Sequence, residues 1–389
     1  MDHLITLSRT LVGAASLKFV RSMHDRIEWN NQLTAILGAR GVGKTTLMIQ
    51  HIKMSNQIEN SLYVNADDFY FAENKLFDMA NQFWKWGGRH LYIDEIHKYP
   101  DWSKELKMMY DYFPDLQVTF TGSSILDIYK GSDDLSRRAL MYPMPGMSFR
   151  EYLEFSEGLH FPAYSLEEIL QNKVRLPGID HPLPLFKQYL QNGYYPFYQQ
   201  PGYQQRLRNV INQVLETDIP AFTNMNVSTA HKLKQLMFIL SQSVPFKPNF
   251  TKISQQMGIH RNQVADYILY MEKAGLINQL RDRIETLGLL GKVEKVYLNN
   301  TNLVFSVVEG VPEIGTIRET FFLNQMQANH QVTASEHADF CIGKFTFEVG
   351  GKSKKKKQIT GIDDAFVVKD DIEYGFGNTI PLWAFGMNY

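Results

Sequence analysis

The chain has 389 residues, of which 44% are hydrophobic and 21% charged, and its formal net charge is −1. This length is too great for one hydrophobic core, so we expect more than one domain. The balanced charge excludes a globally basic field for nucleic acid, so any such contact needs a local patch. The single cysteine, Cys341, excludes an intrachain disulfide. No apolar run reaches the ~18 residues of a membrane span, and we expect a cytoplasmic protein.

A helical segment leads into a short strand and a glycine-rich loop. Residues 1–32 are expected to be helical, and Leu33–Leu37 is an apolar run typical of a strand. The next eight residues, GARGVGKT, fit the pattern G-x-x-x-x-G-K-[ST], and an apolar helical pattern follows. Strand, glycine loop and helix in this order predict a phosphate-binding loop, where backbone N–H groups and a helix N-terminus face the phosphates.

The loop supplies most of the nucleotide-binding residues that we predict. Lys44 is expected to reach the β- and γ-phosphates of ATP, and the Thr45 hydroxyl is expected to hold Mg²⁺. The predicted nucleotide-binding residues are Gly38, Ala39, Arg40, Gly41, Val42, Gly43, Lys44, Thr45 and Thr46, together with Ser123 from a later strand end.

Four further segments have the composition of strands, and helical patterns lie between them. The strand-like segments are 61–65, 90–95, 116–121 and 139–142, and the clearest helical patterns are 75–86 and 102–112. Strands that alternate with helices predict an α/β fold with a mostly parallel sheet covered on both faces. Ligands of such folds bind at the carboxyl ends of the strands, where the glycine loop also lies.

Two acids follow the strand at 90–95, which is the Walker B pattern. Asp94 is expected to hold Mg²⁺, and Glu95 to orient the attacking water as a general base. Ser123 or Ser124 is expected to contact the γ-phosphate, although a serine here also suits a helix cap.

Arg137 and Arg138 precede the fifth strand, and one of them is expected to contact the γ-phosphate; we take Arg138 as the catalytic residue, with Arg137 as the alternative. That contact could be made within one subunit or across two, and a surface arginine pair without this role is the alternative.

These motifs occur in one order that resembles a known family. The segments are 38–45, 94–102, 121–124, 135–138 and 147–152. They resemble the prokaryotic AAA-type ATPases related to the archaeal ATPase group, which carry a C-terminal domain of unknown function 4143. The resemblance implies an AAA core, a winged-helix segment and a C-terminal domain similar to restriction-endonuclease folds. We accordingly expect an ATPase domain at 1–155, a helical and winged-helix segment at 156–295 and a nuclease-like α/β domain at 296–389.

Residues 250–281 have the pattern of two short helices, a turn at Gly258 and a strand, which predicts a helix-turn-helix with a wing. If this module reads DNA, the residues near or on the outer face of its second helix are His260, Arg261, Asn262, Gln263 and Asp266. A protein-contact module is the alternative.

The last segment carries paired acids on two predicted strands. Asp339 and Glu348 have the spacing of a PD-(D/E)xK nuclease core, but the lysine expected at position 350 is a glycine. Lys352 lies about 13 Å beyond Glu348 in an extended strand. An inactive nuclease-like domain is therefore favoured. The lysine run is the best candidate for contact with a phosphate backbone and comprises Lys352, Lys354, Lys355, Lys356 and Lys357.

Together the patterns predict an Mg²⁺-dependent ATPase of AAA type. Two hypotheses about its partner stay open. One is a nucleic-acid-handling ATPase whose lysine run touches backbone phosphates. The other is a nucleotide-gated switch that binds a protein partner and is reset by hydrolysis.

Overall fold

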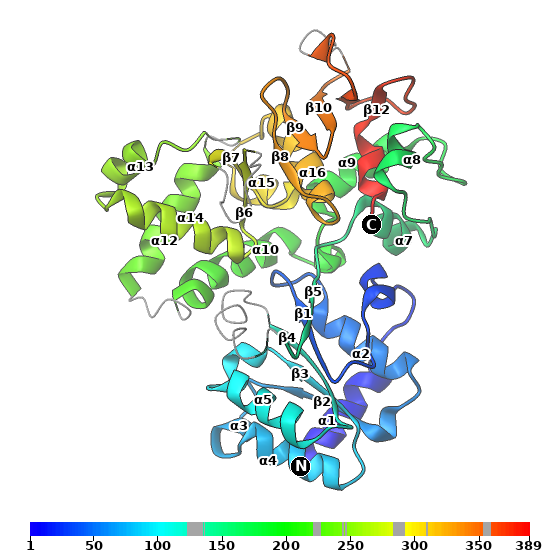
Figure 1. Cartoon of the computed structure of the whole chain (residues 1–389), viewed down its shortest axis with the longest axis vertical. Coiled ribbons are helices and arrows are strands. Elements are labelled where there is room, and N and C mark those ends of the chain that lie inside the picture. The colour runs from blue at the N-terminus through cyan, green and yellow to red at the C-terminus, as the bar shows by residue number, and fades with distance from the viewer. Residues whose placement is uncertain are drawn as a thin grey trace. The chain divides into compact units, whose positions relative to one another are not determined.

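The computed structural model describes residues 1–122, 135, 137–220, 227–242, 245, 247–282, 292–308, 310–352 and 359–389. It divides into two compact units, Met1–Gly146 and Met147–Tyr389 (Figure 1). The segments 156–295 and 296–389, which the sequence analysis separates, both lie in the second unit. Among the described residues, no helix is both long and apolar enough to cross a membrane.

The first unit is built on a five-stranded parallel sheet of order β2-β3-β4-β1-β5. Its strands are β1 Leu33–Leu37, β2 Ser61–Asn65, β3 His90–Asp94, β4 Gln117–Gly122 and β5 Leu140–Pro143. Its helices are α1 Asp2–Ala14, α2 Lys44–Met54, α3 Tyr70–Glu73, α4 Leu76–Lys85 and α5 Trp102–Tyr112, with short 3₁₀ turns η1 Ser22–Arg26, η2 Ile58–Asn60 and η3 Ile96–Lys98. The predicted α/β sheet is thus confirmed, and each strand begins and ends within one residue of its expected bounds.

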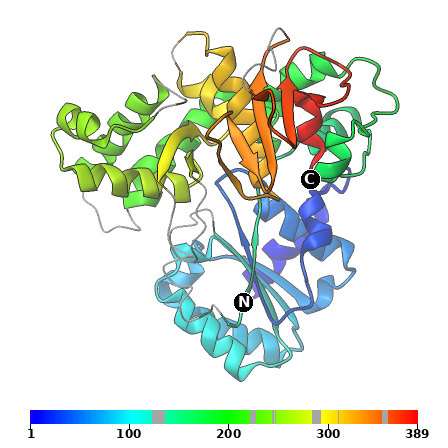
Figure 2. The same ribbon diagram turned by 45° about the horizontal axis from the view of Figure 1, so that its top comes forward.

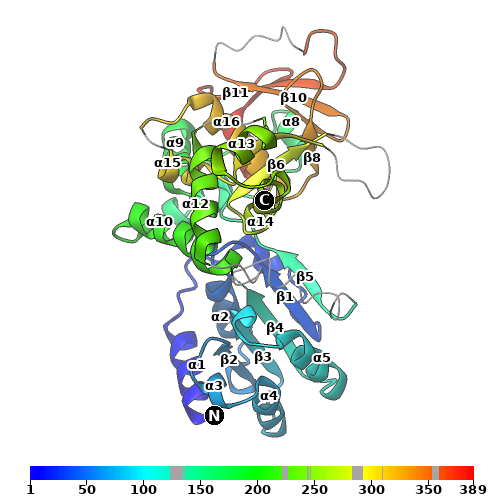
Figure 3. The same ribbon diagram turned by 90° about the vertical axis from the view of Figure 1, so that its left-hand side faces the viewer.

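The helices cover both faces of this sheet, with α1 and α2 on one side and α4 and α5 on the other (Figure 3). Right-handed crossovers require this division, because the chain passes from β1 to β2 in one direction along the sheet and returns through β3 and β4 in the other. All five residues of β1 are buried, as continuous apolar strands between two helical layers are. The N-terminal helix is shorter than expected, since α1 ends at Ala14 and only the short η1 turn follows before β1.

The second unit joins a mainly helical part to a second sheet. Its helices are α7 Phe149–Glu157, α8 Leu166–Leu170, α9 Pro182–Asn192, α10 Tyr203–Gln213, α12 Val227–Ser241, α13 Phe250–Met257, α14 Arg261–Lys273, α15 Thr301–Val307 and α16 Ile314–Gln327. The shorter turns are η4 Pro196–Gln199, the π-helical η5 Val214–Asp218 and η7 Leu382–Met387. Helices α13 and α14 flank Gly258 and are followed by an antiparallel hairpin of β6 Ile277–Arg281 and β7 Val293–Leu298, the element order that a winged helix requires.

The second sheet, drawn in orange to red in Figure 2, is mixed and has the order β12-β11-β10-β9-β8. Its strands are β8 Val332–Ala334, β9 Phe340–Ile342, β10 Phe345–Gly350, β11 Ala365–Lys369 and β12 Thr379–Pro381. Strands β9 and β10 are antiparallel, whereas β10, β11 and β12 are parallel. Helix α16 packs on this sheet through Phe322, whose ring lies 5.1 Å from that of Phe347 and 5.0 Å from that of Phe340.

A fully buried asparagine holds the helical part of the second unit together. The Asn302 side chain on α15 donates to the carbonyl oxygens of Tyr189 and Leu190 at 3.2 and 3.0 Å. It accepts from the Tyr194 backbone N–H at 2.9 Å and from the Tyr203 hydroxyl at 2.8 Å. All four hydrogen-bonding positions of the amide are therefore used, at an exposure of 0%. Tyr194, just after α9, and Tyr203, at the start of α10, are thus fixed by polar contacts to Asn302.

We expect the substitution Asn302→Leu to lower the free energy of unfolding of the second unit by about 3 kcal/mol, because it leaves a buried N–H and a buried hydroxyl without their acceptor. Hydrogen–deuterium exchange of the amides around α9 and α10 would measure the loss. Asn262→Leu, on the exposed start of α14, is the matched control and should change stability by less than about 0.5 kcal/mol. Equal effects of the two substitutions would contradict this role of the network.

Candidate functional site

The glycine loop connects β1 to α2 in the backbone form that a phosphate-binding loop needs. Gly41 and Gly43 have φ angles of 86° and 103°, which side chains disfavour. A side chain at Gly38 would collide with the carbonyl oxygen of Met144. Three of the loop's glycines are therefore required by the local backbone, and the N-terminus of α2 opens directly behind them.

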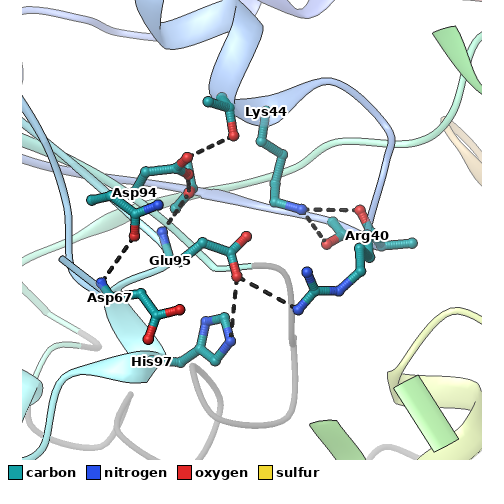
Figure 4. A network of polar contacts seen from close by, with 11 residues as sticks. Arg40, Lys44, Asp67, Asp94, Glu95 and His97 are labelled. Carbon is teal, nitrogen blue, oxygen red and sulfur yellow. Dashed lines mark hydrogen bonds and ion pairs between the residues drawn. The ribbon is translucent and has the colours of Figure 1, made fainter. Parts of the chain in front are cut away.

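Lys44 lies within this loop rather than on its surface. Its Nζ donates to the carbonyl oxygens of Gly38 at 2.8 Å and Ala39 at 2.9 Å, and the residue is 5% exposed (Figure 4). The ammonium group is thus held at the start of α2, where it adds to the positive end of the helix dipole.

A buried arginine that the sequence analysis did not single out supports the loop from behind. Arg21 is 4% exposed and donates to the carbonyl oxygen of Val42 in the loop. Its Nη2 also donates to the carbonyl oxygens of Pro145 and Gly146, both at 2.8 Å. One guanidinium therefore ties the loop to the last residues of the first unit. Five rigid donors make arginine suited to such a contact with several carbonyl groups.

The structure brings Asp94 together with Thr45 and with two further hydroxyl groups. The Thr45 Oγ1 donates to Asp94 Oδ2 at 2.6 Å, and the Tyr63 hydroxyl donates to the same oxygen at 3.0 Å. The Thr121 hydroxyl donates to Asp94 Oδ1. Burial, and then the negative charge of Asp94, raise the pKa of Tyr63, so this hydroxyl keeps its proton and stays a donor.

Glu95 lies beside Asp94 but has different neighbours. Its Oε2 lies 3.7 Å from Arg40 Nη2 and 3.6 Å from His97 Nε2 (Figure 4). Its backbone is left-handed, with φ 52°, and its N–H donates to the Thr121 Oγ1 at 3.3 Å. A left-handed glutamate is uncommon and is a feature that concentrates at functional sites.

The structure describes no contact between the two acids and the remaining predicted site residues, Thr46, Ser123 and Ser124. Thr46 is exposed on the first turn of α2. Ser123 and Ser124 lie outside the described residues. Near the end of β4, the polar side chain that contacts Asp94 is Thr121. Tyr63, Thr121, Arg40 and His97 contact the two acids, and only Arg40 was among the predicted residues.

Arg138 is not brought to the glycine loop of its own chain. It precedes β5, whose Leu140 pairs with Thr34 near the start of β1, so it lies at the amino edge of the sheet. There its Nε lies 3.4 Å from Asp111 Oδ1, and its guanidinium lies over the Tyr110 ring at 5.6 Å. The glycine loop follows β1 at the opposite, carboxyl edge.

Carboxylates of the second unit form a separate cluster around a lysine. Lys295 Nζ lies 3.1 Å from Glu319 Oε2 and 3.5 Å from Asp339 Oδ1. The Tyr297 hydroxyl donates to the same oxygen of Glu319 at 2.7 Å. Burial tends to lower the pKa of Lys295, but the two carboxylates outweigh it and raise that pKa.

The two acids predicted as a nuclease pair, Asp339 and Glu348, lie in the sheet formed by β8 to β12 or directly beside it. Asp339 Oδ2 accepts the backbone N–H of Val349 at 2.9 Å, and Glu348 is 1% exposed. Gly350 stays in the ladder opposite Lys369, so the strand is not shortened by a bulge there. Lys352 is exposed beyond the strand end, and Lys354, Lys355, Lys356 and Lys357 lie outside the described residues.

The donor atoms around Asp94 suit a hard cation. Among the residues that the structure describes, no group of three or more histidine, cysteine, aspartate or glutamate side chains could hold a metal ion. Thr45 and Asp94 instead offer a hydroxyl and a carboxylate oxygen 2.6 Å apart. Mg²⁺ is commonly bound by one or two such protein oxygens together with phosphate oxygens and water.

Comparisons with known proteins match the first unit to a family of described type and part of the second unit to a family of unknown function. Residues 30–153 match a family described as "AAA domain". Residues 183–310 match a family described as "Domain of unknown function (DUF8612)". The expected domain of unknown function 4143 is therefore not confirmed, since a different family matches much of the second unit.

Similar individual proteins include the uncharacterized protein MJ1637 of Methanocaldococcus jannaschii, which is 25% identical over 269 residues, or 63% of this chain. The match spans 56% of that protein, little more than half its length. Similar solved structures include the Walker-type ATPase PABY2304 of Pyrococcus abyssi, with 12% identity, coverage of 74% of this chain and 95% of that chain, and a TM-score of 0.44. DnaA of Aquifex aeolicus bound to AMPPCP has 14% identity, coverage of 70% and 88%, and a TM-score of 0.26.

The match over residues 30–153 and the five-stranded parallel sheet together support an AAA-type P-loop fold for the first unit.

Proposed function

We propose that this chain is an Mg²⁺-dependent ATPase whose chemistry takes place between the glycine loop and the end of β3. The observation that carries the proposal is the 2.6 Å hydrogen bond between Thr45 and Asp94, because it joins the first turn of α2 to the strand-end acid. These are the two side chains that a P-loop ATPase uses to hold Mg²⁺ beside the β- and γ-phosphates. A bound Mg²⁺ would neutralise negative charge on those phosphate oxygens.

The other residues take roles that follow from their positions. Lys44 would exchange its contacts with two loop carbonyls for contacts with the β- and γ-phosphate oxygens. Loop N–H groups and the N-terminus of α2 would surround the β-phosphate. Glu95, next to Asp94, would accept a proton from the attacking water and fix its direction.

Arg138 fits a role across two subunits better than one within its own. It lies at the amino edge of the sheet, and its own glycine loop lies at the carboxyl edge. The partly exposed guanidinium could therefore contact a γ-phosphate only if that phosphate belongs to a neighbouring copy. Positive charge supplied in trans is a known way to stabilise the transition state of phosphoryl transfer.

The second unit supports an inactive nuclease-like domain. Lys295 places a positive charge between Glu319 and Asp339, and position 350 has no side chain to supply the missing lysine.

We propose two alternative binding partners for the chain. One is nucleic acid, bound at Lys352 and the lysines that follow it in the sequence, and the other is a protein. Salt-dependent binding of DNA in a filter assay would favour the first, and recovery of a protein partner without DNA binding would favour the second.

The first functional prediction separates binding from turnover. Lys44→Ala should weaken ATP binding at least about tenfold, because the phosphates lose their charged partner. Glu95→Gln should keep ATP bound and lower turnover about 100-fold or more, because it removes only the proton acceptor. ATP titration and steady-state phosphate release measure the two effects. Lys85→Ala and Glu73→Gln, both at exposed positions, are matched controls that should leave both quantities unchanged. Wild-type turnover in Glu95→Gln would refute the role given to Glu95.

The second functional prediction concerns Arg138. Turnover per subunit should rise with protein concentration, because each site needs a neighbour. Arg138→Ala and Glu95→Gln proteins should each be inactive alone, and their mixture should regain activity where Glu95→Gln subunits supply Arg138 to Arg138→Ala subunits. Arg9→Ala, on the exposed face of α1, is the control and should need no rescue. A rate that is independent of concentration, with no rescue on mixing, would exclude action in trans.

The third functional prediction is negative. We expect no efficient cleavage of plasmid or single-stranded DNA with Mg²⁺ or Mn²⁺, because position 350 supplies no lysine beside Glu348 and Lys295 already pairs with Glu319 and Asp339. Gel electrophoresis of DNA incubated with wild type, Asp339→Ala and Glu348→Ala would show this. Cleavage by wild type that disappears in both variants would contradict the prediction.

A further inference from the structure

Arg40 makes a contact that phosphate binding by a loop does not require. It extends from the loop that follows β1 to the carboxylate of Glu95 at the end of β3, with 3.7 Å between Nη2 and Oε2. Strand β4 lies between β1 and β3, so this contact joins the ends of two strands that are not neighbours in the sheet. Both side chains are partly buried, at 20% and 19% exposure, which limits screening of their charges by water.

Among the described residues Glu95 has ionic contacts with Arg40 and His97, and Arg40 belongs to the loop. His97 lies on the short turn that begins at Glu95, directly after β3, and its side chain is 3% exposed. Arg40 instead moves with the loop that would surround the phosphates. Both contacts, at 3.6 and 3.7 Å, are longer than the ~2.7–2.9 Å of a charge-assisted hydrogen bond, so a better acceptor can displace either one.

We propose that Arg40 is a positioning residue that holds Glu95 aside until the γ-phosphate of a bound nucleoside triphosphate draws its guanidinium away. This inference rests on the proposed ATPase function. A γ-phosphate offers two negative charges and three acceptor oxygens, and arginine's planar fork binds such groups at two points. A nucleoside diphosphate lacks that group, so Arg40 stays on Glu95. Release of the general base is then coupled to the presence of the phosphate that it helps to remove.

A simpler account predicts a different result. If Glu95 only repels the γ-phosphate, Glu95→Gln should tighten binding of a triphosphate whether or not Arg40 is present. If Arg40 is held by Glu95, the same substitution frees the guanidinium for the phosphate, and the gain in affinity disappears once Arg40 is removed. A double-mutant cycle separates these two accounts.

The test is a titration of the full chain with AMPPCP, a non-hydrolysable ATP analogue, and with ADP. The proteins are wild type, Glu95→Gln, Arg40→Ala and the double variant. We expect Glu95→Gln to bind AMPPCP about three- to tenfold more tightly than wild type, the range that one partly buried ion pair supplies. We expect no such difference between Arg40→Ala and the double variant. ADP affinity should change less than about twofold throughout, which a general disturbance of the loop would not allow.

Arg40→Lys should restore part of the coupling, because it keeps the charge but loses the planar fork. Arg9→Ala is the control and should leave both affinities unchanged. Equal tightening of AMPPCP by Glu95→Gln with and without Arg40 would overturn the inference while the proposed function stands. Failure of wild type to bind AMPPCP and ADP at all would overturn the proposed function, and this inference with it.

Discussion

The arrangement of the first unit depends on the hydrogen bonds that the buried carboxylate of Asp94 accepts. Asp94 is 3% exposed and accepts hydrogen bonds from Thr45 on α2, Tyr63 on β2 and Thr121 on β4. A buried carboxylate is costly unless its oxygens are satisfied, and three hydroxyl donors meet that need. The same bonds fix the positions of the elements that supply them, so the loop helix, the edge strand and the central strand converge on one acid.

Adjacent acids in this site are suited to different tasks because their surroundings differ. Asp94 is fixed by hydroxyl groups, whereas Glu95 is more exposed and is held by the longer contacts of Arg40 and His97. The left-handed backbone of Glu95 costs roughly 1–2 kcal/mol in a residue with a side chain. That conformation turns the Glu95 side chain away from Asp94 and toward the loop. One acid is therefore held by three hydroxyl hydrogen bonds, and its neighbour by two longer ionic contacts.

Much of the first unit was predictable because its signals are local. The apolar runs of β1 and β2 have the bounds expected from the sequence, and so does α5. The glycine loop and the acids after β3 follow from short motifs with a known structural context. Even the position of Arg138 at the amino edge follows from a rule, since a residue that precedes a parallel strand lies opposite the carboxyl edge.

The residues that the sequence analysis missed depend on register between distant segments. Tyr63 reaches Asp94 because β2 pairs with β3 so that Asn65 lies opposite Asp94, and the hydroxyl crosses diagonally. Arg21 lies 21 residues before the loop carbonyl that it supports and more than a hundred before its other acceptors. Lys295 reaches Glu319 and Asp339 from a hairpin strand. None of these contacts leaves a periodic pattern in the sequence.

The two acid clusters of the chain differ in whether a cation can join them. A hydroxyl group has both a proton and lone pairs, so Thr45 can turn from donating to Asp94 to coordinating a metal ion without leaving the site. An ammonium group has no lone pair, so Lys295 cannot coordinate a metal ion, and its positive charge weakens the attraction of Glu319 and Asp339 for a divalent cation. The partners of the two clusters therefore differ in kind: hydroxyl groups with lone pairs surround Asp94, whereas an ammonium group lies between Glu319 and Asp339.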